Sequence, residues 1–178
     1  MKAKQQHTPM RFRFSLVVVF CLCILACKET VQKPVSITTK IAEQEKYKAN
    51  TSLYQDLEGN PIALDDYKGK RVLLNYWATW CRPCIEEMPS LLNLQEALKE
   101  DYVVLLASDQ SVSIIQKFKD KKGFDFNFIK FNGAYANLGI NALPVTIVYN
   151  TMGEEVERIA GATTWDSPEM VTKLKSIK

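Results

Sequence analysis

Histidine is almost absent from this chain: among 178 residues there is one, His7, and it lies near the N-terminus. Residues 27–178 therefore contain no imidazole ligand for a metal ion. The remaining thiols cannot replace it, because two thiolates alone make an incomplete zinc site. We expect no metal and no cofactor.

An excess of charge of one sign is also missing from most of the chain. The formal net charge is +3, but the first 26 residues hold four basic side chains and no acidic one: Lys2, Lys4, Arg11 and Arg13. Without these four, 19 basic residues face 20 acidic ones, a net charge of −1. A near-neutral body offers no electrostatic footprint for nucleic acid, so we expect no nucleic-acid partner.

The apolar run at the N-terminus is too short to span a membrane. It extends from Phe14 to Ala26, 13 residues, against about 20 for a spanning helix. Basic residues precede it, as in a secretory signal peptide. Ile24-Leu25-Ala26-Cys27 resembles a bacterial lipoprotein box, although that box prefers Leu at the first of these positions and a small residue at the second. We expect a lipoprotein-type signal peptide over residues 1–26 and a lipid on Cys27, with plain secretion or an uncleaved anchor as alternatives.

The next segment is polar and rich in lysine and glutamate. Residues 28–51 contain no glycine and one proline. This composition predicts a polar membrane tether over residues 27–51, with a partner-binding segment as the alternative. A flexible stretch of this length spans roughly 25–30 Å. The compact domain is expected over residues 52–178.

Cysteine is scarce once the N-terminal segment is set aside. Three of the five cysteines lie in or directly after the apolar run: Cys21, Cys23 and Cys27. The remaining pair, Cys81 and Cys84, cannot form a disulfide-stapled scaffold. It follows the apolar run Val72–Trp77 and opens a helical pattern, so both sulfurs should lie at a helix N-terminus. Unpaired N–H groups and the helix dipole favour a thiolate there, and a thiolate attacks disulfides. The pattern predicts a redox centre.

Apolar spacing divides the domain into strands and helices in an α/β order. A turn signal at residues 58–61 predicts a small N-terminal hairpin over residues 53–64. Pro89 should kink the first helix without ending it. The order counts no strand at the alternating aromatic segment 124–128. The other expected elements are strand Arg71–Tyr76, helix Arg82–Lys99, strand Tyr102–Ala107, helix Ser111–Lys122, a short helix near Ala134–Leu138, strands Val145–Tyr149 and Glu154–Ile159, and a helix opened by Ser167-Pro168. We expect a central mixed sheet with helices on both faces.

The string from Asn75 to Pro89, N-Y-W-A-T-W-C-R-P-C-I-E-E-M-P, resembles the active-site string of the TlpA/ResA-like thiol–disulfide oxidoreductases. These are membrane-tethered thioredoxin-like proteins of bacterial envelopes. The resemblance covers about residues 53–178 and includes Leu143-Pro144-Val145-Thr146. It implies a thioredoxin-like fold with an N-terminal β-hairpin extension. Asn75 stands where cytosolic thioredoxins carry a buried Asp, which is usual in this branch.

The resemblance also implies roles for single residues. Cys81 matches the exposed attacking cysteine, and Cys84 matches the resolving one. Pro144 matches a cis-proline that lies against the disulfide. Glu87 matches an acidic residue one helical turn past Cys84, where it could take a proton; a solvated carboxylate is the alternative. An apolar rim for docking a substrate is expected from Trp80, Pro83 and Leu143, whereas Trp77 should be core.

The implied chemistry is thiol–disulfide exchange with protein partners in the envelope, supplied by a membrane thiol-reductant donor. Arg82-Pro83 lacks the histidine of oxidising DsbA-like motifs, so we expect a reductase, with an oxidase or isomerase as the alternative. Cytochrome c maturation and envelope redox homeostasis are the implied settings. We expect a lipid-anchored monomer that faces the periplasm.

Other functions on a similar fold fit the residues less well. A Sco-like copper protein combines its cysteines with a histidine that residues 27–178 lack. A peroxiredoxin needs a different motif, with Thr and Arg near its cysteine. A tethered interaction module with a static disulfide is the non-enzymatic alternative.

Overall fold

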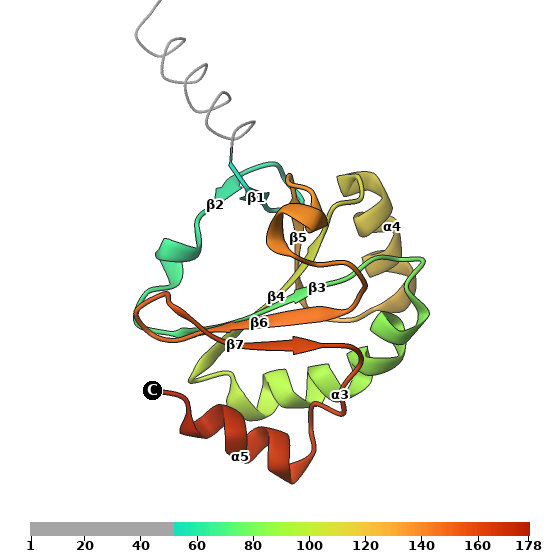
Figure 1. Ribbon diagram of the computed structural model, residues 1–178. Coiled ribbons are helices and arrows are strands. Elements are labelled where there is room, and N and C mark those ends of the chain that lie inside the picture. The colour runs from blue at the N-terminus through green and yellow to red at the C-terminus, as the bar shows by residue number, and fades with distance from the viewer. Residues whose placement is uncertain (1–51) are drawn as a thin grey trace, which may run out of the picture. The chain divides into compact units, whose positions relative to one another are not determined.

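The computed structural model describes residues 52–178, which form a seven-stranded mixed sheet with three α-helices packed against it (Figure 1). The elements in chain order are β1 (Tyr54–Gln55), β2 (Pro61–Ile62), the 3-10 helix η1 (Leu64–Tyr67), β3 (Arg71–Tyr76), α3 (Arg82–Leu98), β4 (Tyr102–Ser108), α4 (Val112–Lys122), β5 (Asn127–Phe131), the 3-10 helix η2 (Tyr135–Leu138), β6 (Val145–Tyr149), β7 (Glu155–Ala160) and α5 (Pro168–Ser176). No helix in this range has both the length and the apolar content needed to cross a membrane.

The strands lie in the order β2-β1-β5-β4-β3-β6-β7. β3, β4 and β5 are parallel, and α3 and α4 provide the crossovers that parallel neighbours require. β6 pairs antiparallel with β3, and β7 pairs antiparallel with β6. β1 and β2 form an antiparallel hairpin whose first strand extends the sheet beside β5. The predicted mixed sheet and hairpin are both confirmed, although each hairpin strand has only two residues.

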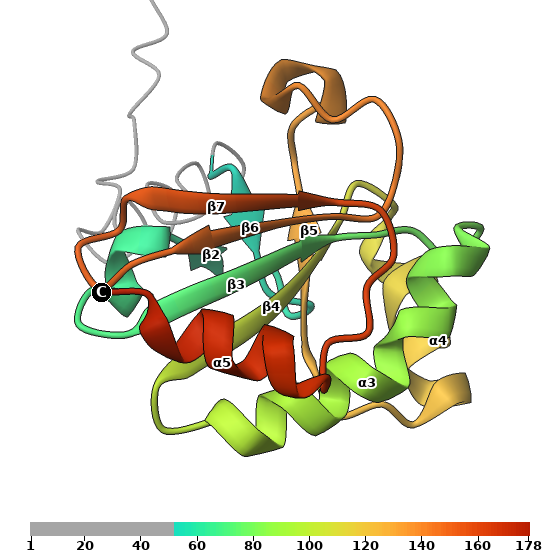
Figure 2. The same cartoon turned by 60° about the horizontal axis from the view of Figure 1, so that its bottom comes forward.

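The two faces of the sheet are covered differently. Successive side chains of a strand point to opposite faces, and in β3 Leu73 belongs to one apolar cluster while Val72 and Leu74 belong to another. The cluster around Leu73 contains the buried side chains of α3, α4 and α5, and the views in Figures 1 and 2 agree that α3 and α5 lie side by side. The other cluster is covered by η1 and η2. Helices do cover both faces as expected, but on the second face they are short 3-10 turns.

β5 is the element that the sequence-based order leaves out. The aromatic alternation from Phe124 to Phe128 overlaps only the start of this strand, and the half-buried Lys130 breaks its apolar pattern. Its position is decided by pairing with β4, from Leu105↔Asn127 to Ser108↔Lys130, and by the contact of its far end with β1. These partners lie far away in the sequence, so local spacing does not reveal the strand.

α3 connects the sheet to the cysteine pair. It runs without a break from Arg82 to Leu98, so Pro89 does not end it, as predicted. Pro83 is in the first turn, where a missing N–H has no helical partner to lose. Cys81 is the N-cap residue. The fold therefore places both cysteines at the N-terminus of α3, shortly after β3 ends, and α3 packs against one face of the sheet.

Candidate active site

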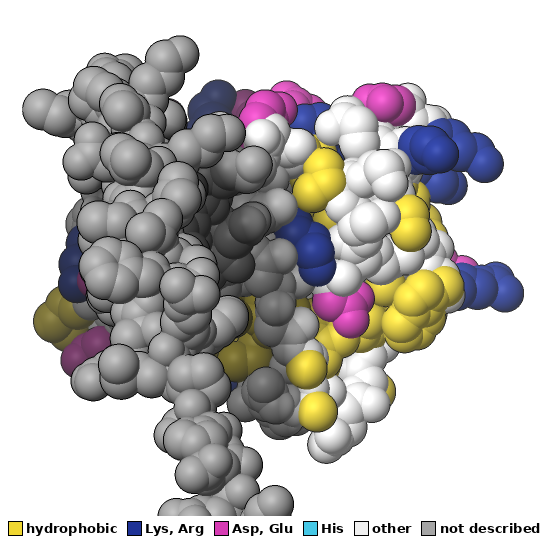
Figure 3. All heavy atoms as spheres, turned by 90° about the horizontal axis from the view of Figure 1, so that it is seen from above, with side chains coloured by type: hydrophobic (Ala, Val, Ile, Leu, Met, Phe, Trp, Pro, Cys, Tyr) yellow, Lys and Arg dark blue, Asp and Glu magenta, His cyan; other side chains and the backbone are white. Residues whose placement is uncertain are grey.

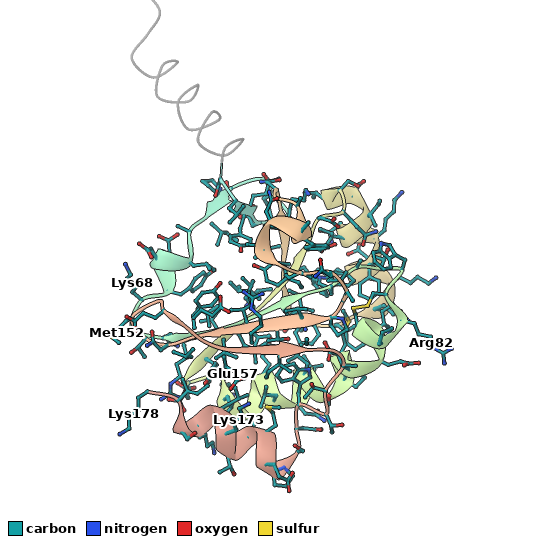
Figure 4. All side chains as sticks on the ribbon, in the orientation of Figure 1. Lys68, Arg82, Met152, Glu157, Lys173 and Lys178 are labelled. Atoms are coloured by element: carbon teal, nitrogen blue, oxygen red, sulfur yellow. A yellow bond between two sulfur atoms is a disulfide. The ribbon has the colours of Figure 1, made fainter. Side chains whose placement is uncertain are left out.

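Cys81 and Cys84 form a disulfide at the N-terminus of α3, with their Cα atoms 5.3 Å apart. The backbone N–H of Cys84 donates to Sγ of Cys81 at 3.3 Å. In the reduced protein the same N–H and the positive end of the helix dipole would stabilise a thiolate on Cys81. The neighbouring Arg82 points outward from this end of the molecule (Figure 4), paired with Glu86 at 2.7 Å. The hydrogen bond and the helix dipole thus act on Cys81, the residue that the resemblance assigns as the attacking cysteine.

The disulfide is more buried than the resemblance implies. Cys81 is 4% exposed and Cys84 is 1% exposed, and both belong to the apolar cluster beneath the sheet. The expected exposure of Cys81 is therefore wrong for the disulfide form. The side chain of Cys84 is buried in the core, and the disulfide bond keeps the sulfur of Cys81 close to it. Leu143 packs against the same apolar cluster.

The predicted docking residues lie at different depths. Trp80 is 71% exposed, Pro83 is exposed and Leu143 is half-buried. Pro144 is buried, and its peptide bond with Leu143 is cis, as predicted. Figure 3 shows hydrophobic side chains gathered on the side where α3 begins, bordered by lysine and arginine. This side of the molecule combines an apolar surface with a disulfide, which suits contact with another protein.

Glu87 is buried, at 5% exposure, and is not the solvated carboxylate of the alternative interpretation. Its Oε1 accepts a hydrogen bond from Nδ2 of Asn75 at 2.8 Å. Its Oε2 accepts from the backbone N–H of Thr163 at 3.0 Å and from the indole N–H of Trp165 at 3.1 Å. All three donors are N–H groups, so the arrangement suits an ionised carboxylate, and the helix carries this acceptor into the core beside Cys84.

Burial raises the pKa of Glu87 above its ordinary value, because the charged form loses its hydration. The hydrogen bonds from Thr163, Asn75 and Trp165 act in the opposite direction and are the smaller effects. Glu87 thus holds a proton at higher pH than a surface carboxyl group does. A group with this property one turn from Cys84 is suited to exchanging a proton with a thiol.

Asn75 connects this carboxylate to the sheet. Its Nδ2 group donates both to Glu87 and, at 2.9 Å, to the hydroxyl of Thr146. Asn75 and Thr146 are direct partners in the β3–β6 ladder. The side chain of Thr146 therefore lies on the same face of the sheet as Asn75 and Glu87. Glu87 also lines an open cavity of about 470 Å³. Its lining comes from α3 and the segment after β7: Glu86, Glu87, Pro89, Ser90, Asn93, Ala162, Thr163, Thr164 and Asp166.

The structure thus brings the cysteines, Glu87 and Asn75 to the start of α3. Trp77 is fully buried, as predicted. Cys27 lies outside the described residues. Sequence reasoning missed Thr163 and Trp165, which contact Glu87 from more than 70 positions away in the chain; only the isolated tryptophan in a polar segment hinted at a buried role. Within residues 52–178, no group of three His, Cys, Asp or Glu side chains is placed to hold a metal ion.

Glu87→Gln should change how the stability of the protein depends on pH. Because burial raises the pKa of Glu87 from 4.5, the stability linked to its proton is complete below pH 4.5 and is lost as the pH rises through the raised value. Each pKa unit between the folded and the unfolded protein corresponds to about 1.4 kcal/mol of folding free energy. We expect the Tm of the wild type minus the Tm of Glu87→Gln to be larger at pH 4 than at pH 7, as measured by thermal unfolding at both pH values.

Glu86→Gln is the matched control, since Glu86 is exposed at the preceding position of the same helix. We expect it to leave the pH profile of Tm unchanged. A wild-type advantage over Glu87→Gln that grows toward pH 7 contradicts the direction assigned to Glu87.

Comparison with known proteins identifies the family. The AhpC/TSA family profile matches residues 45–153. The thiol-disulfide oxidoreductase ResA of Bacillus thuringiensis (strain Al Hakam) is 36% identical over 121 residues, which cover 64% of this chain and 68% of ResA. ResA of Geobacillus thermodenitrificans (strain NG80-2) is 30% identical over 98% of each chain. A crystal structure of a candidate thiol-disulfide oxidoreductase from Bacteroides vulgatus has a TM-score of 0.62 at 29% identity and covers 70% of this chain and 90% of that one. With its cysteine pair at the start of α3, the chain belongs to the AhpC/TSA family and is a thioredoxin-like, ResA-like thiol–disulfide oxidoreductase.

Proposed function

We propose that this protein reduces disulfides of other proteins in the bacterial envelope. The observation that carries the direction is the buried carboxylate of Glu87 beside the resolving cysteine. Residues three apart on a helix have Cβ atoms about 5–6 Å apart, so a charge on Glu87 opposes a second negative charge on Cys84. This repulsion disfavours the reduced form that carries a thiolate on Cys84, and so favours the disulfide form of the pair. A pair that prefers its disulfide form gives electrons to other disulfides.

The helix N-terminus and Glu87 then act on different sulfurs. The N–H of Cys84 and the helix dipole favour a thiolate on Cys81. This thiolate attacks a disulfide of the partner, whose other sulfur leaves as a thiolate, and a mixed disulfide forms on Cys81. Cys84 gives its proton toward Glu87 and attacks Sγ of Cys81, which releases the second sulfur of the partner. Two electrons pass to the partner, and the Cys81–Cys84 disulfide is restored.

The docking rim of Trp80, Pro83 and Leu143 supports a protein as substrate. An exposed indole and proline flanking the cysteine pair give a partner apolar surface to cover. The cis-Pro144 peptide beside them offers backbone to an extended chain, as in the family it resembles. Precursors of c-type cytochromes and envelope proteins with wrong disulfides are both partners of this kind.

The reduction potential of the pair should lie in the range of thioredoxin, about −270 mV, and not near the value of about −120 mV of the oxidant DsbA. Glu87→Gln removes the charge beside Cys84, so its potential should be less negative, by about 30 mV for each 1.4 kcal/mol of repulsion removed. Equilibration with glutathione buffers measures the reduction potentials of the wild type and of Glu87→Gln.

A turnover assay separates a reductase from the alternatives. Insulin reduction should be fast in the wild type. A potential below about −300 mV without turnover favours the static disulfide, and a potential near that of DsbA favours an oxidase.

Cys84→Ser should trap partners as mixed disulfides on Cys81, because the resolving step is removed while the attacking thiol remains. Cys81→Ser is the matched control and should trap none. Non-reducing electrophoresis and mass spectrometry of the adducts identify the partners and separate cytochrome c maturation from general envelope repair. Recovery of glutathione adducts alone contradicts a protein substrate.

We also propose that the catalytic domain, residues 52–178, is held at a membrane by a lipid on Cys27. The signal-like segment 1–26 and the polar tether 27–51 support this arrangement, since they place a cysteine directly after a short apolar run and a spacer before the fold. Two or more acyl chains make such an anchor stable. A tethered monomer could then reach partner proteins and a membrane thiol-reductant donor on the periplasmic side.

Cys27→Ser should move the protein from the membrane fraction to the soluble fraction and abolish its labelling with radioactive palmitate. The matched control is Cys23→Ser, a change within the apolar run. This variant should stay in the membrane fraction and should still be labelled with palmitate. Absence of palmitate labelling from the wild type contradicts the lipid, and retention of that unlabelled protein in the membrane fraction indicates an uncleaved anchor.

A further inference from the structure

The side chain of Gln110 holds the turn that leads into the cysteine pair. Its Oε1 accepts a hydrogen bond from the backbone N–H of Thr79 at 2.7 Å, and its Nε2 donates to Oγ1 of the same residue at 2.9 Å. Thr79 directly precedes Trp80 and Cys81, whereas Gln110 comes from the end of β4. One amide side chain thus holds the N–H and the hydroxyl of a residue 31 positions away.

The segment that carries Gln110 is itself held on both sides. The N–H of Asp109 donates to the hydroxyl of Tyr135 at 3.0 Å, and the carbonyl of Asp109 accepts from Nζ of Lys130 at 2.7 Å. The N–H of Gln110 donates to Oγ of Ser108 at 3.3 Å. Side chains from β5 and η2 therefore immobilise the peptide groups next to Gln110, so that its amide presents a fixed surface to Thr79.

Tyr135 extends the same support to the residues before Thr79. Its hydroxyl donates to the carbonyl of Trp77 at 2.8 Å, while the N–H of Trp77 donates to the carbonyl of Ala107 at 3.1 Å. The N–H of Cys81 closes the turn on the carbonyl of Ala78 at 3.0 Å. The N–H of Thr79 is bonded by the side chain of Gln110, so a substitution of Gln110 removes this contact and leaves the backbone bonds of the turn in place.

We infer that Gln110 is a positioning residue, which fixes the turn at Thr79 so that Trp80 receives a partner protein with its sulfur opposite Cys81. The inference rests on the docking rim of the proposed function. Exchange requires the attacking, central and leaving sulfurs to be aligned. If the turn is loosened, only a fraction of the molecules presents Trp80 in the binding geometry, and the apparent affinity falls by that fraction.

A small substrate gives the contrast that tests positioning. A low-molecular-weight aromatic disulfide such as 5,5′-dithiobis(2-nitrobenzoate) reaches Cys81 without covering the docking rim. Loss of the contact to Thr79 should therefore slow reactions with proteins and leave this reaction almost unchanged. A residue that only maintains the fold would affect both substrates alike.

The experiment compares the full-length protein in detergent with Gln110→Ala and with Gln116→Ala. The second change is the matched control, because Gln116 also makes a side-chain amide contact, at 2.8 Å, but to Asp120 on α4. With insulin as substrate, we expect Gln110→Ala to raise KM at least fivefold with kcat within twofold, and to expose the amide of Thr79 to fast hydrogen exchange. The rate with the small disulfide should stay within twofold. Gln116→Ala should match the wild type throughout.

Gln110→Glu provides a rescue, since a carboxylate can accept from both the N–H and the hydroxyl of Thr79. We expect it to recover most of the affinity for insulin. If Gln110→Ala does not fold, Thr79→Val replaces it; this change removes only the hydroxyl contact and should give a smaller loss of the same pattern.

Equal kinetics for Gln110→Ala and Gln116→Ala overturn the inference, and so does an equal loss with both substrates. Failure of the wild type to reduce insulin instead contradicts the proposed direction. The role of Gln110 is then tested in the oxidising direction, with the disulfide form of the protein and with reduced, unfolded ribonuclease as the protein substrate. Gln110→Ala should again raise KM for this substrate.

Discussion

The buried carboxylate of Glu87 is the constraint on which this end of the molecule depends. It accepts from Asn75 on β3 and from Thr163 and Trp165 after β7, and so joins α3 to two segments, one of which would otherwise bury the unpaired indole N–H of Trp165. Each unpaired buried donor would cost about 1–3 kcal/mol. An acceptor with two oxygens serves all three donors at once, which offsets the cost of burying the charge of a carboxylate here.

That solution has a chemical consequence. The same burial that makes Glu87 useful to the fold raises its pKa and places its charge beside Cys84. An ordinary surface glutamate, such as Glu86, would be screened by water and would influence neither thiol. In the proposed function, one side chain therefore serves both the structure and the tuning of the thiols. The same carboxylate that bonds to Trp165 in the core lies one helical turn from Cys84.

Local pattern was enough for some of these features and not for others. The spacing around Cys81 predicted the N-terminus of α3, because capping and apolar periodicity act within a few residues. The burial of Glu87 was not visible in that pattern, since Glu86 and Glu87 look alike until β7 and the segment after it fold back. β5 was missed for the same reason: Lys130 breaks the apolar run, but its amine is satisfied by carbonyls of Asp109 and Phe131.

The cysteine pair is supported from two directions with different tasks. On the core side, Asn75 holds the carboxylate of Glu87, whose charge acts on the thiols in the proposed function. On the outer side, Gln110 and Tyr135 act on the backbone before Trp80, where no charge is needed and neutral hydrogen bonds fix geometry. In the proposed function this separation lets the turn before Trp80 change without changing the charge near the sulfurs. The relation between fold and chemistry is therefore closest at α3, which begins at the turn and contains the carboxylate.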